Sequence, residues 1–174
     1  MSDLQVKGLA ELAAALQQLP AKVEANLMRA ALRAGAKVIA VQARANVHSV
    51  SGVLAKSVRF GAKLQGRGSG RVSGYVRAGG RGSKAAKAAF YAHMVEFGTA
   101  RHVIKAPPGA RLNVRGVFYR SVEHPGARKH PFMLPAFDAK GAAAVSAVAE
   151  YLRRRLASKH GIDVSAPRDP EAEE

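Results

Sequence analysis

The 174-residue sequence contains no cysteine and no tryptophan. The absence of cysteine excludes disulfides and thiol chemistry, and it fits assembly in a reducing cytoplasm. No apolar run reaches the roughly 18 residues that a membrane-spanning helix needs. The N-terminal residues Met1 to Leu4 lack the basic and apolar regions of a signal peptide, so we expect no secretion signal. A chain of this length is expected to form one domain that buries about 70% of its unfolded surface.

Acidic residues are also scarce, with 12 Asp and Glu against 28 Lys and Arg and a net charge of +16. Residues 25–95 contain thirteen basic side chains and no acidic one, whereas residues 163–174 hold five acids and one arginine. Such an excess of positive charge creates an electrostatic potential that attracts polyanions and repels like-charged surfaces. It indicates contact with DNA or with an acidic partner. A solvated surface that keeps the protein soluble is the alternative, and residues 163–174 read as an exposed acidic tail.

The sequence contains no known catalytic or metal-binding motif. His93 and Glu96 lie three positions apart, and His102, His124 and His130 follow, but no zinc-binding pattern such as His-Glu-x-x-His is present. No serine lies in a nucleophile elbow between a strand and a helix. The glycine-rich segments do not match the Walker pattern that binds phosphate. We therefore expect no enzymatic activity, no catalytic residue, no metal and no cofactor.

Apolar periodicity predicts three helices and two strands. The expected helices cover residues 4–19, residues 21–45 and a terminal segment from Pro135 to Gly161, and the expected strands cover residues 56–65 and 71–79. The buried face of the second helix is predicted as Val23, Leu27, Ala31, Ala34, Val38, Val41 and Ala45. That of the terminal helix is predicted as Phe137, Gly141, Val145, Val148, Leu152 and Leu156. The fold class is therefore α+β, a small antiparallel sheet flanked by long N-terminal and C-terminal helices.

Basic side chains recur along one face of the second predicted helix, at intervals of four and then seven residues. Two glycine-rich loops, residues 66–70 and 79–84, carry further arginines, and glycine lets a backbone approach phosphates closely. The residues that we consider for contact with DNA or an acidic partner are Arg29, Arg33, Lys37, Arg44, Arg67, Arg71 and Arg81. Like charges at this spacing repel, which favours a negative surface opposite them. Plain solvent exposure stays open.

Residues 100–129 read as an extended arm or hairpin that precedes the terminal helix. Loops this long in compact domains usually have a function or are disordered. The segment is rich in apolar residues, namely Val103, Ile104, Val117, Phe118 and Tyr119. Because exposed apolar patches are usually small on monomers, we expect the arm to contact other subunits.

Two short boxes flank this arm. The first is Tyr91-Ala92-His93-Met94-Val95-Glu96-Phe97-Gly98-Thr99, and the second is Pro131-Phe132-Met133-Leu134-Pro135-Ala136-Phe137. Glu96 is the only carboxylate between Glu24 and Glu123, and an unpaired buried charge is costly. We therefore expect it to pair with an arginine or with backbone N–H groups of the same subunit. The residues expected to build this structural and assembly junction are Tyr91, Val95, Glu96, Phe97, Gly98, Pro131, Phe132, Met133 and Pro135.

The boxes resemble the signature of a tail-component family of long-tailed bacteriophages, in which a Pro-Phe-Met-x-Pro-Ala box opens the last helix. Weaker matches lie upstream in Gly8-Leu9, Glu11-Leu12, Leu16 and Leu19-Pro20, and in Ser51-Gly52-Val53-Leu54-Ala55-Lys56-Ser57-Val58. In the latter a serine replaces the usual threonine. The arm is longer than is usual for the family.

The resemblance implies a head–tail joining or tail-completion protein that forms a ring in the neck of the virion. It implies self-association, with a hexamer favoured over a dodecamer, and contact with a stopper or connector, a tail terminator or a tail tube. DNA would pass through the lumen without sequence-specific contacts, and assembly would take place in the cytoplasm of the host bacterium. On this reading residues 1–162 are a single neck domain and residues 163–174 a flexible tail. The alternative is a free, basic protein that binds nucleic acid without sequence preference.

Overall fold

A computed structural model describes residues 8–48, 52–65, 71–80, 83–162 and 164, and it has the α+β fold that the sequence predicts. The helices are α1 (Leu9–Gln17), α2 (Ala21–Ala45), α3 (Val53–Ser57), α4 (Lys84–Ala88), α5 (Ala92–Phe97) and α6 (Met133–His160). The strands are β1 (Arg59–Leu64), β2 (Val72–Arg77), β3 (His102–Lys105), β4 (Leu112–Val114), β5 (Val117–Tyr119) and β6 (Ser121–His124). They form three two-stranded antiparallel sheets, β1–β2, β3–β6 and β4–β5.

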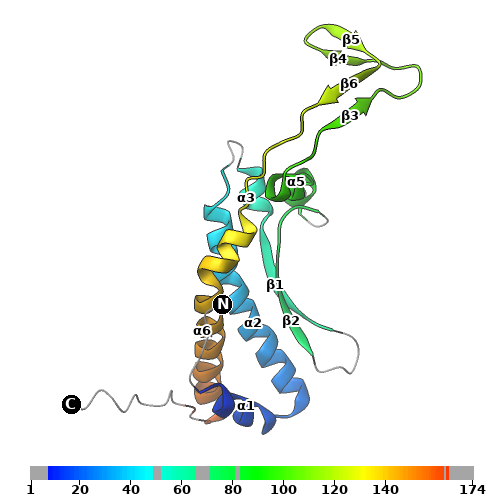
Figure 1. Cartoon of the computed structure of the whole chain (residues 1–174). Helices are drawn as coiled ribbons and strands as arrows, with labels where there is room; N and C mark the ends of the chain where they lie inside the picture. Colours follow the sequence, from blue (N-terminus) through cyan, green and yellow to red (C-terminus); the bar gives the residue numbers. More distant parts are fainter. Residues whose placement is uncertain (1–7, 49–51, 66–70, 81–82, 163, 165–174) are drawn as a thin grey trace, which may run out of the picture.

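Helix α2 lies at the centre of the body, with α6 packed along one side and the β1–β2 hairpin along another (Figure 1). One buried cluster joins α1, the first half of α2 and the second half of α6, through Leu16, Leu27 and Leu152 among others. A second cluster joins the other half of α2 to α3, α5 and the start of α6, around Phe132. The two long helices are therefore antiparallel, and both hydrophobic clusters lie along them.

The two long helices approach closely at Gly35 of α2. A Cβ atom at this position would lie 2.7 Å from the carbonyl oxygen of Ala144 and 2.7 Å from Cγ2 of Val148, both in α6. Real Cβ atoms do not come this close to their neighbours, so the helices can keep this separation only with glycine at position 35. Glycine inside a helix costs conformational entropy. At position 35 that cost is offset because the absence of a side chain lets α2 and α6 pack this closely.

The Gly35→Ala variant is expected to be less stable than the wild type, although alanine favours a helix by about 1 kcal/mol over glycine. Overpacking costs about 1–3 kcal/mol, so the unfavourable contact with α6 outweighs the gain. Gly141→Ala in α6 is the matched control, because nothing lies within 4 Å of its Cβ position. That control should gain about 0.5–1 kcal/mol. Urea denaturation of both variants measures the difference, and equal gains would contradict the close packing at Gly35.

The expected buried faces of the long helices are partly wrong. Val41 is 53% exposed, whereas Ala40 and Ala43 are fully buried. The prediction followed one continuous stripe, but α2 is covered on two sides, and the covered surface shifts around the helix along its length. In α6 Leu152 and Leu156 are buried as expected, but Phe137 is 59% exposed, because none of the described elements covers that face of its first half.

The boundaries of smaller elements also differ from the predictions. Helix α1 begins at Leu9, and the expected residues 4–7 lie outside the described part of the chain. The strand expected from Lys56 begins at Arg59, because a short helix, α3, ends at Ser57. The Ser57 hydroxyl donates to the Leu54 carbonyl at 2.6 Å and accepts from the Gly79 N–H at 3.1 Å. The glycine-rich tip at residues 66–70 and the acidic tail, apart from Val164, also lie outside the described residues.

Candidate functional site

The Glu96 carboxylate caps the N-terminus of α6. Its Oε2 atom accepts hydrogen bonds from the backbone N–H groups of Phe132 at 2.8 Å and Met133 at 2.9 Å. Its Oε1 atom accepts from the N–H of Leu134 at 2.9 Å. The first N–H groups of a helix have no partner within the helix, and the helix dipole favours a negative charge there. Of the two partners expected for Glu96, the structure therefore has the backbone N–H groups.

The environment of Glu96 acts on its pKa in opposite directions. Burial of the side chain raises the pKa, while the hydrogen bonds from Met133, Phe132 and Leu134 lower it. The hydrogen bonds outweigh burial, and the pKa of Glu96 lies below its ordinary value. The group is thus ionised at neutral pH, where the charged form accepts all three bonds.

Further contacts hold the two boxes together around this cap. Phe132 is the largest fully buried side chain among the described residues, and its carbonyl accepts from the Asn46 amide at 3.2 Å. The His130 N–H donates to the Val95 carbonyl at 2.7 Å. The end of α2, helix α5 and the start of α6 therefore meet at one junction.

The expected junction residues divide into buried and exposed groups. Phe132 is buried and Tyr91, Val95 and Met133 pack against the same cluster. Phe97 is 79% exposed, and Pro131 and Pro135 are exposed as well. The structure thus brings all of these residues to one region, while only part of the set holds the fold together.

A pair of glycines sets the base of the arm. Thr99 and Ala127 form an antiparallel bridge, with N–H to carbonyl distances of 3.0 and 3.1 Å. Gly98 has φ 73°, and a Cβ there would lie 2.7 Å from the Ala127 carbonyl oxygen. Gly126 has φ 88°, and a Cβ there would clash with the Thr99 carbonyl oxygen. Thr99 and Gly126 are not among the residues predicted for the junction, although the Pro125-Gly126 pair is a turn signal that marks the return of the chain.

The arm itself projects from the body beyond α5 (Figure 1). Its shaft is β3–β6 and its tip is the β4–β5 hairpin, closed by Arg115 and Gly116, which both have positive φ. Most apolar side chains of the arm are exposed, including Val103, Ile104, Val114, Val117, Phe118 and Tyr119. A two-stranded hairpin is only marginally stable by itself in water, so the tip lacks the packing that such a hairpin needs.

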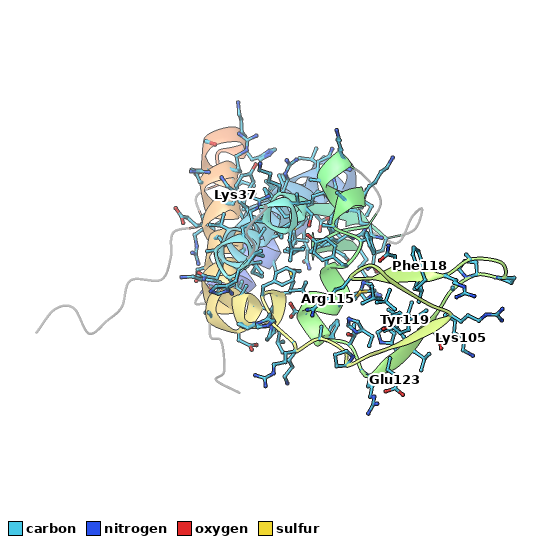
Figure 2. The ribbon with its side chains drawn as sticks, turned by 90° about the horizontal axis from the view of Figure 1, so that it is seen from above. Lys37, Lys105, Arg115, Phe118, Tyr119 and Glu123 are labelled. Atoms are coloured by element: carbon cyan, nitrogen blue, oxygen red, sulfur yellow. The ribbon has the colours of Figure 1, made fainter. Side chains whose placement is uncertain are left out.

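The basic stripe on α2 is exposed along its length. Arg29, Arg33, Lys37 and Arg44 all have exposed side chains. Arg44 is also used within the body, since its guanidinium donates to the Val58 carbonyl at 2.7 Å and lies 5.9 Å from the Phe60 ring centre. Arg71 is exposed next to β2, while Arg67 and Arg81 lie outside the described residues. Figure 2 shows Lys37 on the body, well apart from Arg115 and Tyr119 on the arm.

Within the described residues, no group of three or more His, Asp or Glu side chains could hold a metal ion. The rings of His102 and His124 lie 5.0 Å apart on the arm, and each Nδ1 atom bonds to the nearby backbone. In the same part of the chain, no helix is both long and apolar enough to cross a membrane.

The sequence profile of one bacteriophage family matches residues 10–98, about half of the chain. The family is HK97-gp10-like, described as "Bacteriophage HK97-gp10, putative tail-component". The chain belongs to this family. The match runs from α1 through α5 and includes Glu96, whereas the arm and α6 lie beyond it. No curated protein matches the chain significantly, and neither does any solved structure. As an HK97-gp10-like tail component, the protein is a structural part of a phage virion.

Proposed function

We propose that the protein forms a ring at the junction of head and tail and completes the tail or joins it to the head. The ring consists of copies of this chain, a hexamer in preference to a dodecamer. It contacts a stopper or connector on one side and a tail terminator or tail tube on the other, and DNA passes through its lumen. The ring assembles in the cytoplasm of the host bacterium. We propose no enzymatic role for the chain.

The main support for the proposal is the exposed apolar surface of the arm. It leaves the body at a hydrogen-bonded base and exposes apolar side chains over most of its length. Exposed apolar surface of this extent marks an interaction site on a soluble protein. A free nucleic-acid-binding protein, the alternative, needs basic side chains but has no use for an apolar arm. The arm therefore favours assembly with other protein subunits.

A phage that carries a stop codon in the gene for this chain tests the proposal. Without the protein, we expect electron micrographs to show DNA-filled heads and separate tails, and the wild-type chain supplied from a plasmid should restore joined particles. Joined, infectious particles in its absence would contradict a role in completing or joining the tail. Disordered or missing tail tubes would instead place the protein earlier in tail assembly.

The basic stripe on α2 is proposed to face DNA in the lumen. We expect the purified protein to bind DNA without sequence preference, with a log–log salt slope of roughly −4 to −5. Replacing Arg29, Arg33 and Lys37 with glutamine should make the slope shallower by about one unit per lost contact. Neutralising Arg154, Arg155 and Lys159 in α6 is the charge-matched control and should leave the slope near that of the wild type.

The same variants separate DNA contact from protein contact. If the stripe faces an acidic neighbouring ring, the α2 variant will fail to restore joined particles and will keep the salt slope of the wild type. If the α2 and the α6 substitutions change the salt slope equally, DNA binds to basic residues anywhere on the surface. The stripe on α2 would then not be a specific DNA-facing surface. An unchanged slope together with intact assembly would mean that the stripe is only solvated.

A further inference from the structure

A groove of about 1070 Å³ runs between α6 and β2, with α2 as its floor and α5 at one end. Its lining is largely apolar and includes Ala36 and Ile39 of α2 and Val148 of α6. Large apolar side chains stand exposed at its rim, with Phe97 at 79% and Phe137 at 59% exposure. This groove is where the expected buried face of α6 lacks cover in the described chain.

We propose that this groove binds the tip of the arm, the β4–β5 hairpin, from a second copy of the chain. The inference rests on the proposed ring, because it names the surfaces through which the copies meet. The arm of the same copy extends from α5 away from β2 and from most of α6 (Figure 1), and no residue of its tip lines the groove.

The tip hairpin has one apolar face that suits an apolar groove. In its register Leu112 pairs with Tyr119 and Val114 with Val117. Side chains of directly paired residues project on the same side of a hairpin, and residues two apart in a strand do so too. These four side chains therefore share one face, and Val117 on it is 53% exposed. Packing against the groove would supply the apolar contact that an isolated two-stranded hairpin needs.

Both surfaces also carry charged side chains. The tip is flanked by the exposed cations Arg111, Arg115 and Arg120. The lining of the groove includes Arg59, Arg77 and the capping residue Glu96, whereas Asp138 is an exposed residue of α6 that follows the lining residue Phe137. Among the described residues Asp138 forms no ion pair. In a chain of net charge +16, copies repel each other, so in the contact that we propose the burial of the apolar surfaces of tip and groove supplies the attraction.

The arm and the groove are different surfaces of one chain, so the contact is heterologous. Each copy then offers an arm to one neighbour and a groove to the other. A heterologous contact closes into a ring when its rotation closes, and otherwise propagates as a filament. The inferred contact is thus of the kind that a ring requires.

Two variants, each defective in one surface, test the inference by sedimentation velocity. The first is the double variant Val117→Asp and Tyr119→Asp, which impairs the arm and leaves the groove intact. The second is Phe137→Asp, which impairs the groove and leaves the arm intact. We expect the wild type to form closed oligomers, each variant alone to be monomeric, and an equal mixture of the two to form one-to-one dimers. The mixture stops at dimers because only one intact arm and one intact groove can meet.

Val41→Asp is the matched control, since Val41 is an exposed apolar residue of α2 that does not line the groove. It should assemble as the wild type does, and circular dichroism should show that all variants keep their helices. A Phe137→Asp variant that still forms the wild-type oligomer would overturn the inference and leave the proposed ring standing. A mixture that remains monomeric would also overturn it, because arm and groove would then not bind each other. A wild-type chain that stays monomeric, in solution and in the virion, would overturn the proposed ring as well.

Discussion

The Glu96→Ala variant is expected to unfold about 3–5 kcal/mol more easily than the wild type, through loss of three charge-assisted hydrogen bonds. Glu96 is only 8% exposed, so little water can reach the backbone N–H groups left without a partner. The 28-residue helix α6 also loses the negative charge at its N-terminus. For a protein of this size, the melting temperature should fall by roughly 6–20 °C.

Two further variants serve as comparisons for the loss of stability in Glu96→Ala. Glu96→Gln keeps the shape of the side chain but can accept through one oxygen only, so its loss should be smaller than that of alanine. Glu123→Ala removes a carboxylate whose ion pair with Arg101 is exposed, and such pairs contribute about 0–1 kcal/mol. A melting temperature that Glu96→Ala leaves unchanged would show that the cap does not stabilise the junction.

The pH dependence of Glu96→Gln follows from the lowered pKa of Glu96. A carboxylate whose folded pKa lies below its unfolded value of about 4.3 stabilises the protein above that value. The stabilisation is lost as the pH falls through the folded pKa. The difference in melting temperature between wild type and Glu96→Gln should therefore be full near pH 7 and should shrink on acidification. A difference that grows toward low pH would contradict the lowered pKa.

Removal of residues 106–120 is expected to abolish the ring and to leave the body folded. Lys105 and Ser121 are directly paired in the shaft of the arm, so an Asn-Gly turn can join them and close the shortened hairpin. The deleted residues contribute no side chain to either buried cluster, and the melting temperature should change little. The sedimentation coefficient should fall from that of a ring to that of a monomer.

The deletion is compared with Arg115→Asn, which alters the tip turn but suits the positive φ of that residue. This control keeps the apolar face of the tip and should assemble. In the phage that lacks the gene, the deletion variant should fail to restore joined particles. If it restores them at the wild-type level, the arm does not join the subunits and the proposed function loses its main support.

The sequence predicted the elements that local chemistry specifies. Helix α2 has the predicted bounds, because Pro20 separates it from the preceding helix and the apolar period is regular. The lone acid Glu96 indicated that it has a partner, an arginine or backbone N–H groups, because a carboxylate in an apolar segment needs one; the structure shows the backbone N–H groups. The start of α6 followed from the box that contains Pro135, which lies in the first turn of that helix.

The remaining features depend on contacts that periodicity does not specify. A stripe of apolar residues shows that a helix face is buried, but not whether the same chain or a partner buries it. Phe137 and Val145 continue the stripe of Leu152 and Leu156, yet they line an open groove. Gly35 gave no signal in the sequence, because its role arises from a helix more than 100 residues away along the chain. The predicted contacts of Arg67 and Arg81 fall outside the described residues and stay predictions.

The proposed ring can be seen or refuted in a cryo-electron-microscopy reconstruction of the neck of the intact virion. We expect a closed ring of this chain at the head–tail junction, around the DNA channel, with the arm tip of each copy in the groove between α6 and β2 of the next. Density for the chain at any other place in the tail, or as single copies without mutual contact, would contradict it.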